Sequence, residues 1–141
     1  MEYNKKKLEE KYYELQTLDK QIKQLQAHFQ NLENQIIEFH LVKQGLNELN
    51  DTKLENELLV PISPGMFIKT ALRNNTEVIV NVGANVAVKK TVNQAKDMMN
   101  LQTAEVKKVQ TNILMDLQKL SERAVSLEKE INELVTELNK K

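Results

Sequence analysis

Cysteine and tryptophan are both absent from the 141 residues of this chain. Without cysteine there is no disulfide, no thiolate metal site and no cysteine nucleophile, which is compatible with a reducing cytoplasm. Glycine and proline are scarce, with three and two residues. Because these residues form many of the turns in proteins, their scarcity, together with 28% charged residues, points to long helices rather than a compact globule.

Long apolar runs are missing as well. The first residues, MEYNKKKLEEK, are charged and no apolar stretch follows them, so they do not have the pattern of a secretory signal. No run approaches the roughly 20 apolar residues of a membrane-spanning helix. We therefore expect a soluble protein of the cytoplasm without a membrane partner.

Positive charge is not in excess. Lysine plus arginine and aspartate plus glutamate each number 20, so the formal net charge is zero. The longest basic run, Lys5–Lys7, is followed at once by Glu9 and Glu10. Proteins normally bind nucleic acids with clustered positive charge, so we expect no nucleic-acid partner.

The sequence does contain two long heptad patterns. The first predicts a coiled-coil helix within residues 1–50, from about residue 4 to about residue 49. Lys11 and Lys43 are polar exceptions in its seam, the line of side chains that faces a partner helix. The apolar seam positions are Leu8, Leu15, Leu18, Ile22, Leu25, Phe29, Leu32, Ile36, Phe39 and Leu46.

The second heptad pattern predicts a helix over residues 92–141. It begins with Val106 and Val109 and continues through Leu117 to the C-terminal turns. Two four-residue steps between Val109 and Leu117 predict a stutter, which locally unwinds a supercoil. Thr91 and Gln94 have the spacing of a capping box at the start of this helix.

Residues 57–91, between the helices, have a β pattern. Strand-like runs at 57–62, 66–72, 77–82 and 86–91 are separated by SPG, NN and GAN. The Pro-Gly pair suits a type II turn, and the asparagine pair and Gly83 suit positive φ. The expected fold is therefore α+β and mainly α. It is a single domain, 1–141, in which an antiparallel two-helix coiled coil flanks two β-hairpins.

Apolar residues on both faces of these short strands predict assembly. Small sheets need a covered face, and free strand edges pair readily. Strands from other chains would cover the faces, and closure into a barrel would remove the edges. The predicted oligomerisation residues are Leu59, Val60, Ile62, Phe67, Ile68, Val78, Ile79, Val80, Val82, Val86 and Val88.

The order of these motifs resembles the alpha-type subunit of prefoldin. The segments that carry the resemblance are ELLVPISPGMFIKTAL (57–72) and EVIVNVGANVAVKKT (77–91), set between heptad helices. The resemblance covers essentially the whole chain. It implies a hexamer of two alpha and four beta subunits with a double β-barrel, whose coiled-coil tips hold unfolded proteins for a group II chaperonin without ATP. Some related alpha-like chains assemble differently.

Patterns of a catalytic or metal site are not found. His28 and His40 flank the seam 12 residues apart, whereas ligands on one helix face are typically four apart. The three glycines are too far apart to form a phosphate-binding loop. We expect no enzyme activity, no cofactor and no catalytic, cofactor-binding or metal-binding residue.

The candidate binding surface lies at the two chain ends. Folding back at the strands places Leu8 near residues 127–134, and the open end of a two-helix coil has no third layer to cover it. The predicted client-binding residues are Tyr3, Leu8, Tyr12, Tyr13, Leu127, Ile131, Leu134, Val135 and Leu138. For the seam residues, closing the coiled coil is a competing role. The alternative function is an architectural coiled-coil or filament-forming subunit without client binding.

Overall fold

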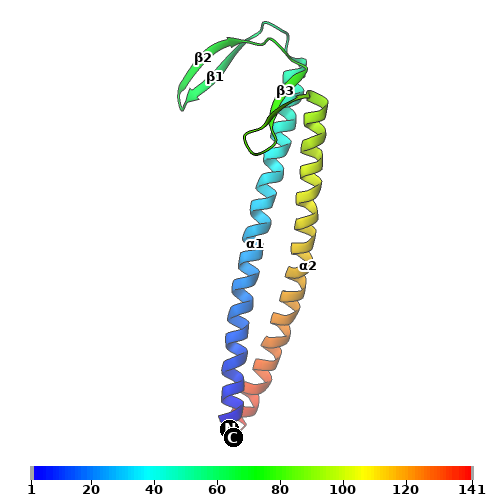
Figure 1. The fold of residues 1–141 in the computed structure, drawn as a ribbon. Helices are drawn as coiled ribbons and strands as arrows, with labels where there is room; N and C mark the ends of the chain where they lie inside the picture. Colours follow the sequence, from blue (N-terminus) through cyan, green and yellow to red (C-terminus); the bar gives the residue numbers. More distant parts are fainter. Residues whose placement is uncertain (1, 141) are drawn as a thin grey trace. The chain divides into compact units, whose positions relative to one another are not determined.

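The computed structural model describes residues 2–140 and contains two long helices with four strands between them (Figure 1). The elements are α1 (Glu2–Asp51), β1 (Glu57–Ser63), β2 (Met66–Ala71), β3 (Glu77–Asn81), β4 (Ala87–Thr91) and α2 (Val92–Asn139). This order confirms the predicted fold class, and the predicted helices and strands begin and end within a few residues of the observed ones.

The chain divides into two compact units. Unit 1 comprises Met1–Asn34 and Val106–Lys141, and unit 2 comprises Gln35–Glu105. Each unit therefore contains a segment of α1 and a segment of α2, and all four strands belong to unit 2.

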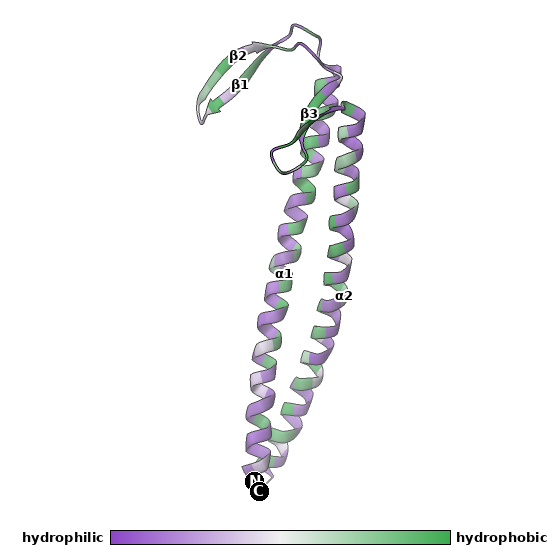
Figure 2. Cartoon of the chain, in the orientation of Figure 1, coloured by the Kyte–Doolittle hydropathy of each residue, from purple (hydrophilic) through white to green (hydrophobic). Residues whose placement is uncertain are grey.

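In unit 1 the two helix segments pack along the heptad seam. Lys11 contacts Glu130, and Gln110 contacts Glu33, so early residues of α1 lie beside late residues of α2 and the segments are antiparallel. Figure 2 shows apolar bands recurring at regular intervals along both helices. The buried apolar side chains of unit 1 are Leu18, Leu32, Ile113, Leu127 and Ile131.

The seam of α2 differs from the prediction at one position. Val109 is 42% exposed, whereas Gln110 is only 7% exposed. With Gln110 in the seam, the steps from Val106 to Gln110, Ile113 and Leu117 are four, three and four. The predicted stutter between Val109 and Leu117 is therefore wrong. The heptad continues there because the buried side chain of Gln110 occupies a seam position, which a search for apolar residues alone does not find.

The strands of unit 2 form two separate antiparallel sheets, β1 with β2 and β3 with β4. Val60 pairs with Ile68 in the first sheet, and Val80 pairs with Val88 in the second. The register of the first sheet shifts after Pro61, which has no backbone N–H to donate. Two sheets of two strands leave four free edges within the chain, so barrel closure requires strands of other chains.

The turns follow their predicted sites but not always the predicted mechanism. Gly65 and Gly83 have φ angles of 80° and 108°, which glycine adopts without strain. The expected positive φ at Asn74 and Asn75 is wrong. The Asn74 side-chain oxygen instead accepts hydrogen bonds from the backbone N–H groups of Thr76 (2.9 Å) and Glu77 (3.0 Å). An asparagine side chain that stabilises the turn in this way removes the need for a left-handed backbone.

The start of α2 confirms the predicted capping box. The backbone N–H of Gln94 donates to Thr91 Oγ1 at 3.1 Å, and the backbone N–H of Thr91 donates to Gln94 Oε1 at 3.0 Å. Val92, the next residue, is buried and donates its N–H to the carbonyl of Thr76 at 2.8 Å. The reciprocal cap and this backbone contact connect the start of the helix to the strand region.

Candidate functional site

Three exposed tyrosines lie near the end of unit 1 that contains both chain ends. We call residues 2–14 and 123–140 the tip. Tyr13 is 73% exposed, and Tyr3 and Tyr12 are exposed as well. Their positions outside the seam account for this, since no second layer of helices covers the outer face of a two-helix coil. The structure thus leaves these three predicted residues accessible.

The other six predicted tip residues lie on or beside the seam. Leu127 has no exposed surface and Ile131 is also buried. Four residues are half-buried: Leu8, Leu134, Val135 and Leu138. The helix segments must therefore separate before Leu127 or Ile131 can contact another molecule, whereas the tyrosines need no such change.

A network of charged side chains joins α1 and α2 within the tip. Lys11 donates a hydrogen bond to Glu130, and Arg123 donates two to Glu14, at 3.0 and 3.3 Å. Arg123 also lies 3.7 Å from a carboxylate oxygen of Glu130. Because Lys11 contacts Glu130, the preceding turn at Leu8 lies close to the predicted range 127–134.

The environment of Glu130 favours its charged form. The hydrogen bond from Lys11 is the main cause that lowers the pKa of the Glu130 carboxyl, and the positive charges of Lys11, Arg123 and Lys7 act in the same direction. Partial desolvation opposes this shift. The only sequence signal of this network was the lysine at position 11, where the heptad pattern favours an apolar residue.

Several exposed apolar residues were not predicted as site residues. Val125 is 66% exposed on α2, two positions before Leu127, and lines shallow hollows with residues of its own helix. An apolar residue outside a heptad seam is the signal that marks such positions. The other exposed apolar residues of this kind on the helices are Ile37, Leu41, Val42, Leu101, Val109, Leu114 and Met115.

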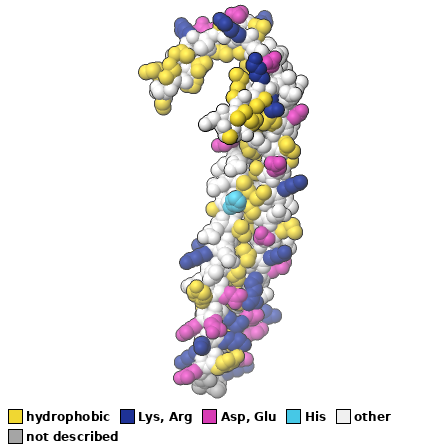
Figure 3. Space-filling model, in the orientation of Figure 1, with side chains coloured by type: hydrophobic (Ala, Val, Ile, Leu, Met, Phe, Trp, Pro, Cys, Tyr) yellow, Lys and Arg dark blue, Asp and Glu magenta, His cyan; other side chains and the backbone are white. Residues whose placement is uncertain are grey.

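Most of the predicted oligomerisation residues are uncovered in the single chain. Figure 3 shows apolar side chains spread over both hairpins. Ile79 is 72% exposed, and the other exposed members are Leu59, Val60, Ile62, Phe67, Ile68, Val82, Val86 and Val88. Such a large share of exposed aliphatic and aromatic surface indicates an interface.

Val78 and Val80 differ from the other predicted oligomerisation residues because both are half-buried. They line a groove of unit 2 whose other walls come from both helices. Val42 and Leu46 contribute from α1, and Ala95, Met98 and Met99 contribute from α2. One face of the second hairpin is therefore partly covered by this chain, while Ile79, on the opposite face, is left open.

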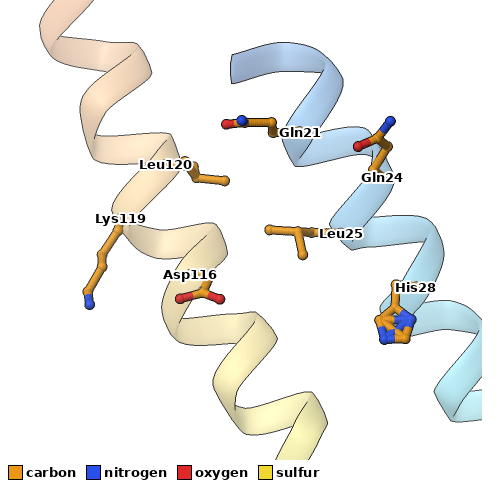
Figure 4. A pocket seen from close by; sticks show the side chains of 7 residues that line it. All are labelled: Gln21, Gln24, Leu25, His28, Asp116, Lys119 and Leu120. Carbon is orange, nitrogen blue, oxygen red and sulfur yellow. The ribbon is translucent and has the colours of Figure 1, made fainter. Parts of the chain in front are cut away.

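A second groove of about 590 Å³ lies along the coil of unit 1 (Figure 4). Leu25 and Leu120 point toward one another from the facing helices, and polar side chains surround them, including His28 and Asp116. Within residues 2–140, no three His, Cys, Asp or Glu side chains come together as a metal site. No helix of the described chain is both long and apolar enough to cross a membrane.

Comparisons with known proteins agree with this architecture. Residues 18–137 match the family model of the prefoldin subunit. Prefoldin subunit alpha 1 of Thermococcus kodakarensis is 35% identical over 100 residues, which are 71% of this chain and 68% of that one. Prefoldin subunit alpha of Pyrococcus horikoshii is 32% identical over 124 residues, which are 84% of this chain and 83% of that one.

A solved structure has a similar fold. It is the cryo-EM structure of filamentous PFD from Methanocaldococcus jannaschii, with a TM-score of 0.75 and 17% sequence identity. The match covers 82% of this chain and 95% of the other. The similarity at this level of identity concerns the arrangement of helices and hairpins.

Proposed function

The chain belongs to the prefoldin family, and from this we propose that it is an alpha-type subunit of an ATP-independent chaperone that holds non-native polypeptides at its tip. The observation that carries the proposal is the exposure of Tyr3, Tyr12 and Tyr13 within a tip that also contains charged residues. An aromatic ring with a polar hydroxyl contacts apolar groups without requiring one sequence, which suits the binding of many unfolded chains.

The tip binds weakly by itself under this proposal. Apolar contact contributes roughly 25 cal/mol per Å² of buried surface, and a few partly exposed rings offer only a modest area. Several tips that contact one client at the same time gain affinity through effective concentration. This combination gives reversible holding without nucleotide hydrolysis, and it agrees with the expectation that the chain is no enzyme.

Assembly through the strands supplies the several tips. The exposed hairpins support association with beta-type prefoldin subunits in a hexamer of two alpha and four beta chains. Strands from neighbouring subunits would cover Ile79 and Phe67 and complete a barrel. We propose further that the assembly works in the cytoplasm and passes its clients to a group II chaperonin.

A matched pair of variants tests client holding. Tyr12→Ser with Tyr13→Ser removes two adjacent exposed side chains from the tip. Leu114→Ser with Met115→Ser removes two adjacent side chains, also exposed, from unit 1 outside the tip. In the full assembly we expect the tyrosine variant to suppress aggregation of an unfolded client much less than wild type, and the control to match wild type.

Two outcomes of this test would contradict the proposal. If both double variants suppress aggregation as wild type does, the tyrosines hold no client. If both lose the effect equally, exposed apolar surface acts without regard to the tip. Helix content and assembly mass, measured on the same samples, separate these results from a loss of structure.

The fold similarity to a chain of a filamentous assembly favours one second candidate, an architectural or filament-forming subunit. In that case the chain alone forms particles whose length grows with concentration, and the tyrosine variant changes nothing. Light scattering and electron microscopy of the chain, alone and mixed with a beta-type subunit, distinguish this from a closed hexamer of constant mass.

A further inference from the structure

The two hairpins repeat one pattern of sequence and pairing. Residues 57–71 read ELLVPISPGMFIKTA and residues 77–91 read EVIVNVGANVAVKKT, so the pattern of the first hairpin recurs twenty positions later. The strand register repeats with the same offset, since residue 59 pairs with residue 69 and residue 79 pairs with residue 89. The strands of the two hairpins can therefore be compared position by position.

Backbone hydrogen bonds show which groups of the second hairpin face its free edges. In an antiparallel pair, residues that exchange hydrogen bonds alternate with residues whose N–H and C=O groups point away from the partner strand. At the turn end, the N–H of Val82 donates to the carbonyl of Val86 at 3.0 Å. At the other end, the N–H of Val92 donates to the carbonyl of Thr76 at 2.8 Å. The even-numbered residues of β3 thus bond to β4, and its odd-numbered residues face the free edge.

The same alternation in the first hairpin directs a proline toward the free edge of β1. The N–H of Leu72 donates to the carbonyl of Asn56 at 3.0 Å, so even-numbered residues of β1 bond to β2 and odd-numbered residues face outward. Pro61 is one of the outward residues, and proline has no N–H. Its equivalent in β3 is Asn81, which has one. The two free edges therefore differ by a hydrogen-bond donor at the same position.

A bulge adds to this difference between the edges. The register of β1 and β2 shifts between Pro61 and Ser63, whereas β3 and β4 pair without a shift. Proline and bulges are two features by which natural edge strands avoid pairing with other chains. On the edge of β3, the N–H of Glu77 donates to the Asn74 side chain at 3.0 Å. That bond can exchange for a bond to another strand, whereas a proline cannot gain a donor.

From this difference we propose that Pro61 closes the free edge of β1 to strand addition, and that the free edge of β3 accepts a strand of a beta-type subunit. The inference rests on the proposed assembly, because it names the edge of this chain that the assembly uses. Exposure does not separate the two edges, since Leu59 is 60% and Ile79 is 72% exposed. The backbone donors separate them, and growth of the sheet by further strands stops beside Pro61.

Hydrogen exchange of the wild-type assembly compares the two edges directly. Leu59 and Ile79 are equivalent, and the N–H of neither residue bonds within its hairpin. In the assembly with a beta-type subunit, we expect the Ile79 amide to exchange at least about tenfold more slowly than the Leu59 amide, because only Ile79 gains a strand partner. Equal protection of both amides, or of neither, overturns the proposal.

Moving the proline to the second hairpin tests whether the edge of β3 is used. Asn81→Pro removes an outward N–H and should leave the pairing of β3 with β4 intact. Asn81→Ala is the matched control, because both variants lose the side chain that accepts the N–H of Gly83 and only alanine keeps the backbone donor. We expect Asn81→Pro to raise the Kd for a beta-type subunit at least about tenfold, and Asn81→Ala to stay within about twofold of wild type.

Equal Kd values of these two variants overturn the use of the β3 edge. A loss that affects only self-association of the chain, and not its binding to the beta-type subunit, also overturns the proposal, because a second copy would then be the occupant. Light scattering of the chain alone and of the mixture separates these outcomes.

The opposite substitution opens the edge of β1. Pro61→Asn supplies the missing donor, and Pro64→Asn, between β1 and β2, is the matched control. With the beta-type subunit, we expect only Pro61→Asn to form particles larger than those of wild type, with a mass that rises with concentration. A wild-type mass for Pro61→Asn overturns the closing role of Pro61, and this variant decides that role even where Asn81→Pro does not fold. No client is present in these measurements, so their outcomes are distinct from failure of the client-holding test.

Discussion

Similar aliphatic side chains are buried in one unit of this chain and exposed in the other. In unit 1, Leu127 has no exposed surface because the facing helix covers it. In unit 2, Ile79 is 72% exposed although it lies in a regular strand. A helix segment of unit 1 finds its partner within the chain, whereas the hairpins of unit 2 have edges and faces that this chain does not cover. The comparison separates side chains that this chain buries by itself from side chains that only another chain could cover.

The largest effect is expected from a substitution on the exposed hairpins of unit 2. Ile79→Glu places a carboxylate in the predicted interface, and burying it without a partner from another chain costs several kcal/mol, so assembly should be lost. The hairpin itself should survive, because residue 79 pairs with Lys89 across the strands. The assembly mass, measured by light scattering, checks this prediction.

Val125→Glu is the matched control for Ile79→Glu. It replaces an aliphatic side chain that is similarly exposed but lies on α2 of unit 1. We expect the assembly mass of this variant to equal that of wild type. An unchanged mass in the Ile79 variant would contradict the assignment of the strands as the assembly surface.

The next largest effect is expected from a substitution in the buried seam of unit 1. Leu127→Ala should lower the free energy of unfolding by about 2–4 kcal/mol, because it leaves a cavity where the side chain was fully buried. Leu59→Ala in the unassembled chain should lower it by less than about 1 kcal/mol, since Leu59 is already exposed there. Thermal unfolding followed by circular dichroism measures both, and equal losses would remove the distinction between the units.

A smaller effect on stability is expected from replacing the buried amide in the seam of unit 1. Gln110→Leu should raise the free energy of unfolding by about 1 kcal/mol, because an apolar side chain replaces a buried amide in the seam. Glu33, which loses its partner, is half-buried and can turn to water. Gln118→Leu is the control at an exposed position and should change little. A less stable Gln110 variant would show that the contact with Glu33 contributes more than apolar packing.

The smallest effect is a pH dependence of the tip. The hydrogen bond from Lys11 lowers the pKa of Glu130 below that of the unfolded chain. The stabilisation is therefore complete above the ordinary carboxyl range and is lost as the pH falls through the lowered pKa of the folded tip. Titration of the Glu130 carboxyl by NMR should give a midpoint below its ordinary value, and Lys11→Leu should move that midpoint upward.

Local patterns in the sequence account for most of the elements. The heptads predict α1 and α2, the Thr91–Gln94 spacing predicts the start of α2, and Gly83 predicts a left-handed turn. Each of these elements depends on residues that are close in the chain, so the local sequence is enough to predict the local structure. The exposure of Tyr12 and Tyr13 follows in the same way from their place outside the seam.

Contacts between individual side chains that lie far apart in the sequence were not predictable in this way. Gln110 enters the seam through its contact with Glu33, 77 positions away, and Lys11 meets Glu130 across 119 positions. Val78 and Val80 are partly covered while Ile79 is not, because the helices of unit 2 approach one face of the second hairpin.

The sequence by itself thus determined two coiled-coil helices, two hairpins and three tyrosines outside the seam. Only the tertiary structure decided that Leu127 and Ile131 are covered, that a glutamine keeps the heptad in frame, and that Lys11 joins the helices through Glu130. The reason is physical. Periodicity states which side of a helix is apolar, but the burial and pairing of one side chain depend on the register of the partner helix, and that register is a property of the packed pair.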